Sequence, residues 1–327
     1  VFTDTLVISS NDSETPTVTV PLSALSVFRG DVDGDGVVTV LDVVVFVRIL
    51  IGKNPVPDVG TFAFYTADAN DDGELNVIDV VQQINLVLNI ATRPTTAAIG
   101  RVYLDLEEPL TLPSGQMVIP VVIDADDNVA GVQAEFTFDP DLLHLEAPVP
   151  AVGYEQMTLQ SFMSDGVLRM VMYSPSGELI RDGRKMLMYI PVSRRGEATE
   201  PPELTLYRAI LSDRYARLIN AVIGTSTIKI TDLPTEFSLR ANTPNPFNPS
   251  TRILYEVPRQ AHITMVVYNL LGQEIIRLVD TNRNPGRYAV EWHGVNTLGV
   301  PVASGVYVYR LSSSTGFSES RRMLLLK

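Results

Sequence analysis

DVDGDGVVTVLD at residues 31–42 and DANDDGELNVID at residues 68–79 are two copies of one acidic twelve-residue pattern. A calcium loop of this length takes side-chain oxygens from positions 1, 3, 5 and 12 and a backbone carbonyl from position 7. Position 9 often acts through water, and a glycine at position 6 allows the sharp turn. Both copies meet every requirement, with Gly36 and Gly73 at the turn. One match could arise by chance, but two complete copies predict two bound calcium ions.

The expected ligands are read directly from these positions. Those of the first ion are Asp31, Asp33, Asp35, Val37 through its carbonyl, Thr39 and Asp42. Those of the second ion are Asp68, Asn70, Asp72, Glu74 through its carbonyl, Asn76 and Asp79. Four carboxylates crowded into the first loop repel one another until a cation neutralises them. Calcium binding is therefore expected to be coupled to folding.

An apolar stretch with helical spacing follows each loop, at residues 41–51 and 78–90, and no helix is evident before either loop. This loop–helix pair, repeated after a short linker, resembles a dockerin module over residues 29–90. We assign residues 28–92 to this calcium-binding module. The resemblance implies that calcium folds the module and that its paired helices bind a cohesin.

The resemblance also places the partner-binding residues at loop positions 10 and 11. In this chain they are Val40 and Leu41 in the first copy and Val77 and Ile78 in the second. All four are apolar, which predicts an apolar contact. The near-symmetry of the two copies leaves both binding orientations open. An alternative interpretation is that Leu41 and Ile78 are simply core residues.

Short alternating runs separated by turn signals indicate an all-β sandwich over residues 99–231. The expected strands lie at residues 102–106, 116–123, 131–138, 167–172, 185–192, 204–211 and 227–230. GQMVIPVV at 115–122, the turn at 130–132 and FTFDPDLL at 136–143 make this segment similar to a cohesin. The resemblance implies that one sheet face receives a dockerin, but the sequence does not say which face.

The last segment, residues 233–327, is predicted to be a second, Ig-like β domain. It contains NTPNPFNPST at 242–251, VYNLLGQE at 267–274 and ASGVY at 303–307. These motifs resemble the C-terminal sorting domain of proteins exported by the type IX secretion route. The resemblance implies passage across an outer membrane to the cell surface or the medium.

Residues 1–27 contain two alternating runs, around 6–8 and 17–22, on either side of a turn at 11–16. They resemble the last β-hairpin of an Ig-like domain. A lone hairpin is at best marginally stable in water. Either the fragment has lost its partner strands, or the hairpin packs on the dockerin, on a later domain, or on a neighbouring molecule by strand addition.

Composition excludes several classes of protein. The chain has 327 residues, no cysteine and a formal net charge of −13. The absence of cysteine excludes disulfides and thiol chemistry. The sequence contains no run of about twenty apolar residues of the kind that spans a membrane. It also contains no basic cluster interleaved with aromatic residues of the kind that binds nucleic acid. A start at Val1 without a signal peptide is typical of a processed or trimmed chain.

The charge is unevenly distributed. Residues 29–92 hold ten acidic and three basic residues, a net charge of −7, whereas residues 232–327 hold seven acidic and ten basic residues, a net charge of +3. Much of the acidity of residues 29–92 thus belongs to the expected calcium ligands.

No catalytic residues are proposed. The three histidines, His144, His262 and His293, fall in distant segments, and there is no phosphate-binding loop or nucleophile elbow. The densest carboxylate clusters are already explained by calcium. We expect a chain without enzymatic activity.

The expected fold is therefore mainly β and multidomain: an N-terminal hairpin, a small helical dockerin, and two Ig-like or cohesin-like sandwiches. A dockerin and a cohesin on one chain can dock within one molecule only if the right sheet faces the dockerin, since the linker from Ile90 to Arg101 extends to at most about 40 Å. Docking between copies is head-to-tail and gives a ring or an open filament.

The leading prediction is a secreted structural protein that assembles with other copies of itself through calcium-loaded dockerin–cohesin contacts. The alternatives are an adaptor scaffold for other dockerin- or cohesin-bearing proteins, as in cellulosomes, and the C-terminal part of a secreted hydrolase. Localisation is expected to be extracellular or at the cell surface.

Overall fold

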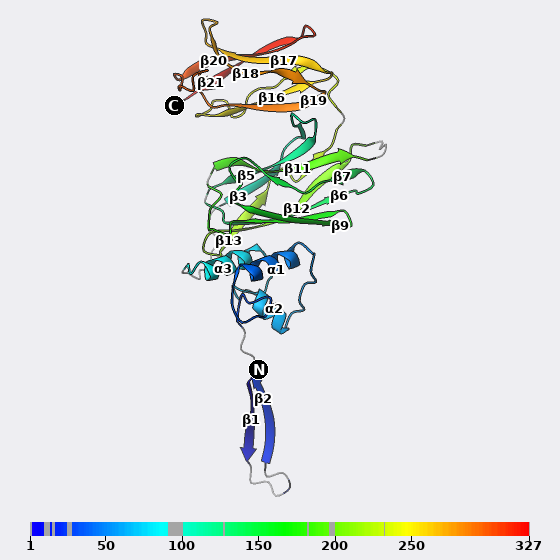
Figure 1. The fold of residues 1–327 in the computed structure, drawn as a ribbon, viewed down its shortest axis with the longest axis vertical. Helices are drawn as coiled ribbons and strands as arrows, with labels where there is room; N and C mark the ends of the chain where they lie inside the picture. Colours follow the sequence, from blue (N-terminus) through cyan, green and yellow to red (C-terminus); the bar gives the residue numbers. More distant parts are fainter. Residues whose placement is uncertain are drawn as a thin grey trace.

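The computed structural model describes residues 2–9, 14, 17–24, 28–90, 101–126, 128–181, 183–195, 200–231 and 233–326. These residues form an elongated molecule in which a β-hairpin, a helical part and two β-sandwiches follow one another in chain order (Figure 1). Strands predominate, and the helices of the described part lie between residues 40 and 87. The predicted mainly β architecture with a small helical module is confirmed.

Two helices of equal length follow the two acidic loops. They are α1 (Val40–Leu50) and α3 (Val77–Val87). Each begins with a capping box, in which the N-cap side chain, Thr39 or Asn76, accepts a hydrogen bond from a backbone N–H of the first turn. In return, the side chain of Asp42 or Asp79 accepts a hydrogen bond from the backbone N–H of the N-cap residue. This arrangement satisfies N–H groups that have no partner within the helix. The predicted helical stretches are thus present, each beginning one residue earlier and ending sooner than expected.

A short helix, α2 (Phe62–Ala67), ends just before Asp68, the first residue of the second loop. The expectation that no helix precedes either loop is therefore wrong for the second loop. The Thr61 side chain caps α2 by accepting a hydrogen bond from the N–H of Phe64 at 3.2 Å. At six residues this helix is too short for its apolar spacing to stand out in the sequence.

The first sandwich is built from strands between residues 101 and 229. They are β3 (Arg101–Leu106), β4 (Leu110–Thr111), β5 (Met117–Ala125), β6 (Gly131–Phe138), β7 (Leu143–Leu145), β8 (Val149–Pro150), β9 (Thr158–Ser164), β10 (Val167–Tyr173), β11 (Gly183–Arg194), β12 (Glu203–Ser212), β13 (Leu218–Ile223) and β14 (Thr227–Lys229). One layer runs β7-β11-β5-β3, the other runs β12-β6-β10-β9, and β13 links them. Every predicted strand is present, and the sequence does not predict β9, β13 or the short strands β4, β7 and β8.

The core of this sandwich lies between the two layers. Leu104, Ile123, Phe136 and Leu168 are fully buried members of one apolar cluster. The link between layers depends on β13, which pairs antiparallel with β12 and parallel with β3. Strands β3 and β13 are far apart in the sequence, so the chain must fold back on itself to pair them in parallel.

The second sandwich has two antiparallel sheets. Their strands are β15 (Ser238–Leu239), β16 (Thr251–Val257), β17 (Ala261–Tyr268), β18 (Glu274–Arg283), β19 (Gly286–Trp292), β20 (Gly305–Ser313) and β21 (Ser318–Leu325). The sheets, β15-β16-β19 and β18-β17-β20-β21, enclose a core that includes Tyr255, Trp292 and Tyr309. This confirms the β character predicted for the segment.

The two sandwiches are joined by ion pairs and one close backbone approach. Glu107 pairs with Arg184 of its own sandwich at 3.0 Å and with Arg252 of the second. The backbone N–H of Arg287 donates to Thr111 Oγ1 at 3.1 Å. The neighbouring Gly286 lies so close to Thr111 that an added Cβ would be 2.3 Å from Oγ1. The contact therefore requires glycine at this position.

The predicted N-terminal hairpin is present as β1 (Phe2–Ser9) and β2 (Thr17–Ala24). Cross-strand partners share a face, and the pairs Leu6–Val20 and Ile8–Val18 give one face apolar side chains, all exposed. Figure 1 shows the hairpin extending away from the helices. Most of the turn predicted at residues 11–16 lies outside the described residues.

Candidate functional site: two calcium loops and a docked helix face

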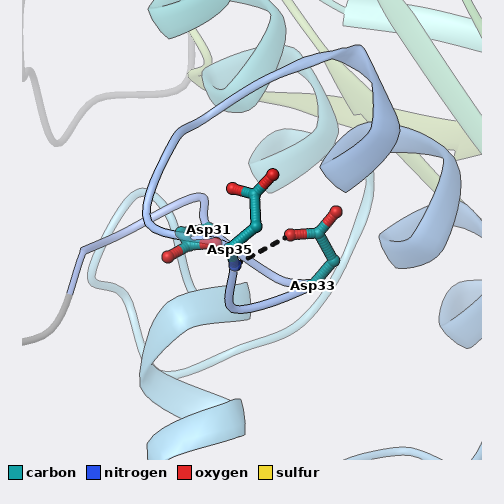
Figure 2. Close-up of side chains that lie close together, drawn as sticks. All are labelled: Asp31, Asp33 and Asp35. Carbon is teal, nitrogen blue, oxygen red and sulfur yellow. Dashed lines mark hydrogen bonds between the residues drawn. The ribbon is translucent and has the colours of Figure 1, made fainter.

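The first acidic loop folds its carboxylates around one point. Figure 2 shows Asp31, Asp33 and Asp35 gathered on the loop, and one carboxylate oxygen of each lies within 4.8 Å of the others. Backbone N–H groups hold them there: Gly34 and Gly36 donate to Asp31 at 2.9 and 3.0 Å, and Asp35 donates to Asp33 at 3.1 Å. These bonds fix the orientation of the Asp31 and Asp33 carboxylates.

The second loop repeats this construction. Asp68 accepts from the N–H groups of Asp72 and Gly73, both at 3.1 Å, and Asp72 accepts from Glu74 at 2.9 Å. Asn70 takes the third position, where its Oδ1 accepts from the Asp72 N–H at 3.2 Å. The bonds from positions 5, 6 and 7 thus recur in both loops, with the Asp33 carboxylate replaced by the Asn70 amide. The remaining bond differs, because Asp31 Oδ1 accepts from Gly34 at position 4 whereas Asp68 Oδ1 accepts from Asp72 at position 5.

The last ligand position of each loop is fully buried. Asp42 and Asp79 are 0 % exposed. Asp42 Oδ1 accepts from the Val32 N–H at 2.8 Å, and its Oδ2 accepts from the Thr39 N–H at 2.7 Å. Asp79 Oδ1 accepts from the Asn70 N–H at 3.2 Å, and its Oδ2 accepts from the Asn76 N–H at 3.0 Å. Each carboxylate therefore ties its loop to the start of the following helix.

Thr39 and Asn76 have a function that the calcium pattern alone does not reveal. Thr39 Oγ1 accepts from the Leu41 N–H at 3.1 Å, and Asn76 Oδ1 accepts from the Ile78 N–H at 2.8 Å. They are the N-caps of α1 and α3. The capping-box spacing, with Asp three residues later, is the sequence signal that identifies them.

The electrostatics of both loops favour a bound cation. Burial, strengthened by the charges of Asp72 and Asp68, raises the pKa of Asp79 to about 7 although two backbone N–H groups act in the opposite direction. The N–H of Asp35 lowers the pKa of Asp33, but desolvation and neighbouring carboxylates outweigh it, so this pKa lies above its ordinary value. Crowded oxygen donors of this kind suit Ca²⁺, whose charge offsets their repulsion.

The helical part docks on the first sandwich through α3 and the end of α1. Figure 1 shows both helices against the layer that contains β9 and β12. Val171 and Tyr173 of β10 belong to the same buried cluster as Phe46, Val47 and Val80 of the helices. Burying each such side chain stabilises the contact by about 1.5–3 kcal/mol. The two parts therefore share one apolar core.

Specific contacts fix the position of α3. The buried N–H of Val77 donates to Gln133 Oε1 at 3.1 Å, and Asn85 Nδ2 donates to the carbonyl of Arg214 at 3.0 Å. Gly131 lies directly under the helix, where an added Cβ would be 2.8 Å from Val77 Cγ2 and 3.0 Å from Val81 Cγ2. The helix can approach this closely because residue 131 has no side chain.

The structure separates the four predicted partner-binding residues into two pairs. Val77 and Ile78, at the start of α3, are 0 % and 3 % exposed, and Val77 contacts the sandwich. Val40 and Leu41, at the start of α1, are 50 % and 64 % exposed. The contact therefore uses the start of the second helix and leaves the start of the first one open to solvent.

The receiving face was not assigned from the sequence. It comprises outward positions of three strands, including Gly131, Gln133, Val171, Tyr173 and Ile210. In VLRMVMY at 167–173, apolar residues occupy the outward positions 171 and 173 as well as the inward ones. A strand that is apolar on both faces indicates that both are covered, and this signal could have identified β10.

Comparison with known proteins identifies the helical part. Residues 29–88 match the family model of the dockerin type I domain. No curated protein matches the chain.

Three solved structures illustrate the likeness of the sandwich. A type I cohesin–dockerin complex from Clostridium thermocellum matches 42 % of this chain and 96 % of its own chain, with 10 % identity and a TM-score of 0.33. The sixth cohesin of Acetivibrio cellulolyticus scaffoldin B, in complex with a mutant Cel5 dockerin, matches 40 % and 99 %, with 11 % identity and a TM-score of 0.34. A non-cellulosomal cohesin from Archaeoglobus fulgidus matches 40 % and 92 %, with 13 % identity and a TM-score of 0.33.

Residues 29–88 thus match a dockerin domain, and part of the chain is structurally similar to cohesin domains. Dockerin domains bind calcium, and dockerins and cohesins are non-catalytic modules that mediate protein–protein interaction. Within the described residues, no helix has the length and apolar character needed to cross a membrane.

Proposed function

We propose that this chain is a secreted, non-catalytic structural protein whose copies join head-to-tail through calcium-loaded dockerin–cohesin contacts. The observation that supports it most is the shared core between the helices and β10, with Val77 bonded to Gln133. We refer to this contact of α3 and α1 with β6, β10 and β12 as the joint. It pairs two modules whose shapes fit closely enough to require Gly131.

In the structure the helices and the sandwich that form the joint belong to the same chain. The same surfaces can meet between copies, because exchange of an identical element preserves every contact. Closure within the chain is favoured at low concentration, since the linker between Ile90 and Arg101, at most about 40 Å long, keeps the dockerin near its own sandwich. At high concentration, exchange leaves a free dockerin at one end of an assembly and a free sandwich face at the other, so the assembly grows.

Two calcium ions would brace the joint. We propose the twelve ligands predicted from the two loops, with Val37 and Glu74 acting through their carbonyls. The ions would do no chemistry. They would hold each loop against the N-terminus of α1 or α3, through Asp42 and Asp79, and so present α3 to the sandwich.

The domain boundaries that fit this proposal are 1–27, 28–92, 99–231 and 233–327. The hairpin would add a second joint through its apolar face, where Leu6, Ile8, Val18 and Val20 are exposed. The last domain, with its resemblance to type IX sorting domains, would direct export across an outer membrane. The protein would then work at the cell surface or in the medium.

A second candidate function is an adaptor that binds other cohesin-bearing proteins. The observation that favours it is the exposure of Val40 and Leu41 while α3 is docked. A chain closed on itself through its second repeat would still present the first repeat to another cohesin.

A complementation experiment with full-length chains tests the main proposal. Val77→Asp destroys the dockerin side of the joint, and Gly131→Leu fills the sandwich side, where the helix leaves no room for a Cβ. Neither variant alone should close or polymerise. Their mixture should form a one-to-one complex in calcium, because one variant supplies an intact sandwich and the other an intact dockerin, and a chelator should dissolve it.

Sedimentation velocity measures the complex, and Leu41→Asp serves as the matched control. Leu41 occupies the equivalent position in the first repeat but is exposed, so this substitution should leave complex formation unchanged. A mixture that stays monomeric at high concentration would contradict assembly between copies. Loss of assembly in Leu41→Asp would instead favour the adaptor interpretation.

A further inference from the structure

Two loops of the second sandwich are built to the same plan. In residues 269–273, Asn269 Oδ1 accepts the N–H groups of Leu271 and Gln273, both at 3.0 Å, and the Asn269 N–H donates to the Gln273 carbonyl at 3.1 Å. Gly272 closes the turn with φ of +79° and donates to the Asn269 carbonyl at 3.1 Å.

In residues 296–300 the same bonds recur. Asn296 Oδ1 accepts the N–H groups of Leu298 and Val300, both at 3.0 Å, and the Asn296 N–H donates to the Val300 carbonyl at 2.9 Å. Gly299 has φ of +76°. The two loops lie side by side, since the N–H and the hydroxyl of Thr297 both donate to the Ile275 carbonyl at 3.1 Å.

Each loop holds a leucine in solvent. Leu271 is 83 % exposed and Leu298 is 85 % exposed, with Leu270 at 71 % and Val300 at 53 % beside them. Neither loop, NLLGQ or NTLGV, contains an ionisable side chain. Grouped apolar side chains on a protein surface mark a contact site more often than scattered ones do.

The construction of the loops suits entry into an apolar medium. An unpaired backbone amide is costly there, and in each loop the asparagine side chain accepts two backbone N–H groups, one of them from the exposed leucine. A rigid loop also loses little conformational freedom when its leucine is buried. Two neighbouring loops that each expose a leucine match a deformable partner better than a single shaped pocket.

The charge of this segment indicates which apolar partner it fits. Residues 232–327 carry a net charge of +3, whereas the whole chain carries −13. An anionic lipid surface attracts this end of the molecule and repels the rest. We propose that the loops at 269–273 and 296–300, which we call the leucine loops, anchor the protein to an anionic lipid surface. Leu271 and Leu298 insert into the apolar boundary of that surface.

Co-sedimentation of the full chain with vesicles tests this anchor. The wild-type protein should bind vesicles that contain phosphatidylglycerol more strongly than vesicles of phosphatidylcholine alone. The double variant Leu271→Ser, Leu298→Ser should bind at least about tenfold more weakly. Leu218→Ser, which changes a leucine that is 48 % exposed on the other sandwich, should bind as the wild type does.

A fluorescence measurement gives a second readout that does not depend on loss of binding. The chain has one tryptophan, Trp292, which is buried at 1 % exposure. In a Leu271→Trp variant the new indole should shift its emission to shorter wavelength on anionic vesicles and be quenched by brominated lipids. Absence of wild-type binding to either vesicle, equal binding by the double variant, or unquenched indole emission would overturn the lipid anchor and indicate a protein partner instead.

Discussion

At the scale of single residues, Asp42 and Asp79 combine two functions. Each is the last expected ligand of its calcium loop and the N3 member of a capping box. Both side chains are fully buried, so their charge is compensated by backbone N–H groups and, when bound, by the ion.

Replacing Asp42 by Ala should affect the protein with and without calcium. In the presence of a chelator, loss of the capping box should destabilise α1 by about 1 kcal/mol. Loss of a ligand should weaken calcium binding to the first loop by a factor of about ten or more. Calorimetric titration and thermal unfolding measure the two effects. Asp33→Asn is the control that should bind calcium almost normally, because Asn70 fills that position in the second loop. Unchanged affinity in Asp42→Ala would exclude Asp42 as a ligand.

At the scale of elements, β6 shows how docking changes a strand. Its sequence GVQAEFTF alternates, yet residues 131–136 are all buried. Val132, Ala134 and Phe136 face the sandwich core, whereas Gly131 and Gln133 lie under α3. The strand therefore has two covered faces along half of its length, and the covering element is a helix from a different module.

Gly131→Ala should loosen the joint without unfolding the sandwich. Its backbone φ is not in the left-handed region, so the new methyl group acts only by crowding α3. Overpacking of this kind costs about 1–3 kcal/mol. Hydrogen exchange at the Val77 amide, which donates to Gln133, should accelerate accordingly. Thr137→Ala, on the same face of β6 but exposed, should leave that exchange unchanged. Equal protection in both variants would contradict the close approach as a determinant of docking.

At the scale of the whole molecule, the two sandwiches form one continuous body through a polar junction. Glu107 bridges Arg184 and Arg252 and is only 26 % exposed, whereas the neighbouring pair of Glu108 and Arg240 is more open, at 54 % and 41 %. Partly buried pairs are less screened by solvent than exposed ones, so Glu107 should contribute more to the junction.

Glu107→Ala should uncouple the two sandwiches. Leaving Arg252 without its partner should cost about 1–2 kcal/mol after allowance for solvent screening, and the second sandwich should then unfold at a lower temperature than the first. Differential scanning calorimetry would resolve the two transitions. Glu108→Ala, at the exposed pair, should shift them by less than about 1 kcal/mol. Equal effects of both substitutions would show that burial does not distinguish these ion pairs.

The elements best predicted from the sequence are those whose causes are local. The helices after the two loops and the strands at 131–138 and 167–172 follow from short-range spacing of apolar residues. The helix at 62–67 was missed because one and a half turns carry too little periodicity. Strand β9 was missed because TLQSFMS lacks clean alternation, and β13 because its parallel pairing with β3 depends on a distant segment.

By itself the sequence determined the two acidic loops, their expected ligands and the helices that follow them, because all of these lie within about a dozen residues of chain. Only the tertiary structure decided which repeat docks and on which sheet face. The two repeats are nearly equivalent as sequences, so neither Val40 nor Val77 is distinguished locally. The choice is made by packing: Gly131, Gln133, Val171 and Tyr173 come together only when β6 and β10 are aligned, and the surface they form fits α3.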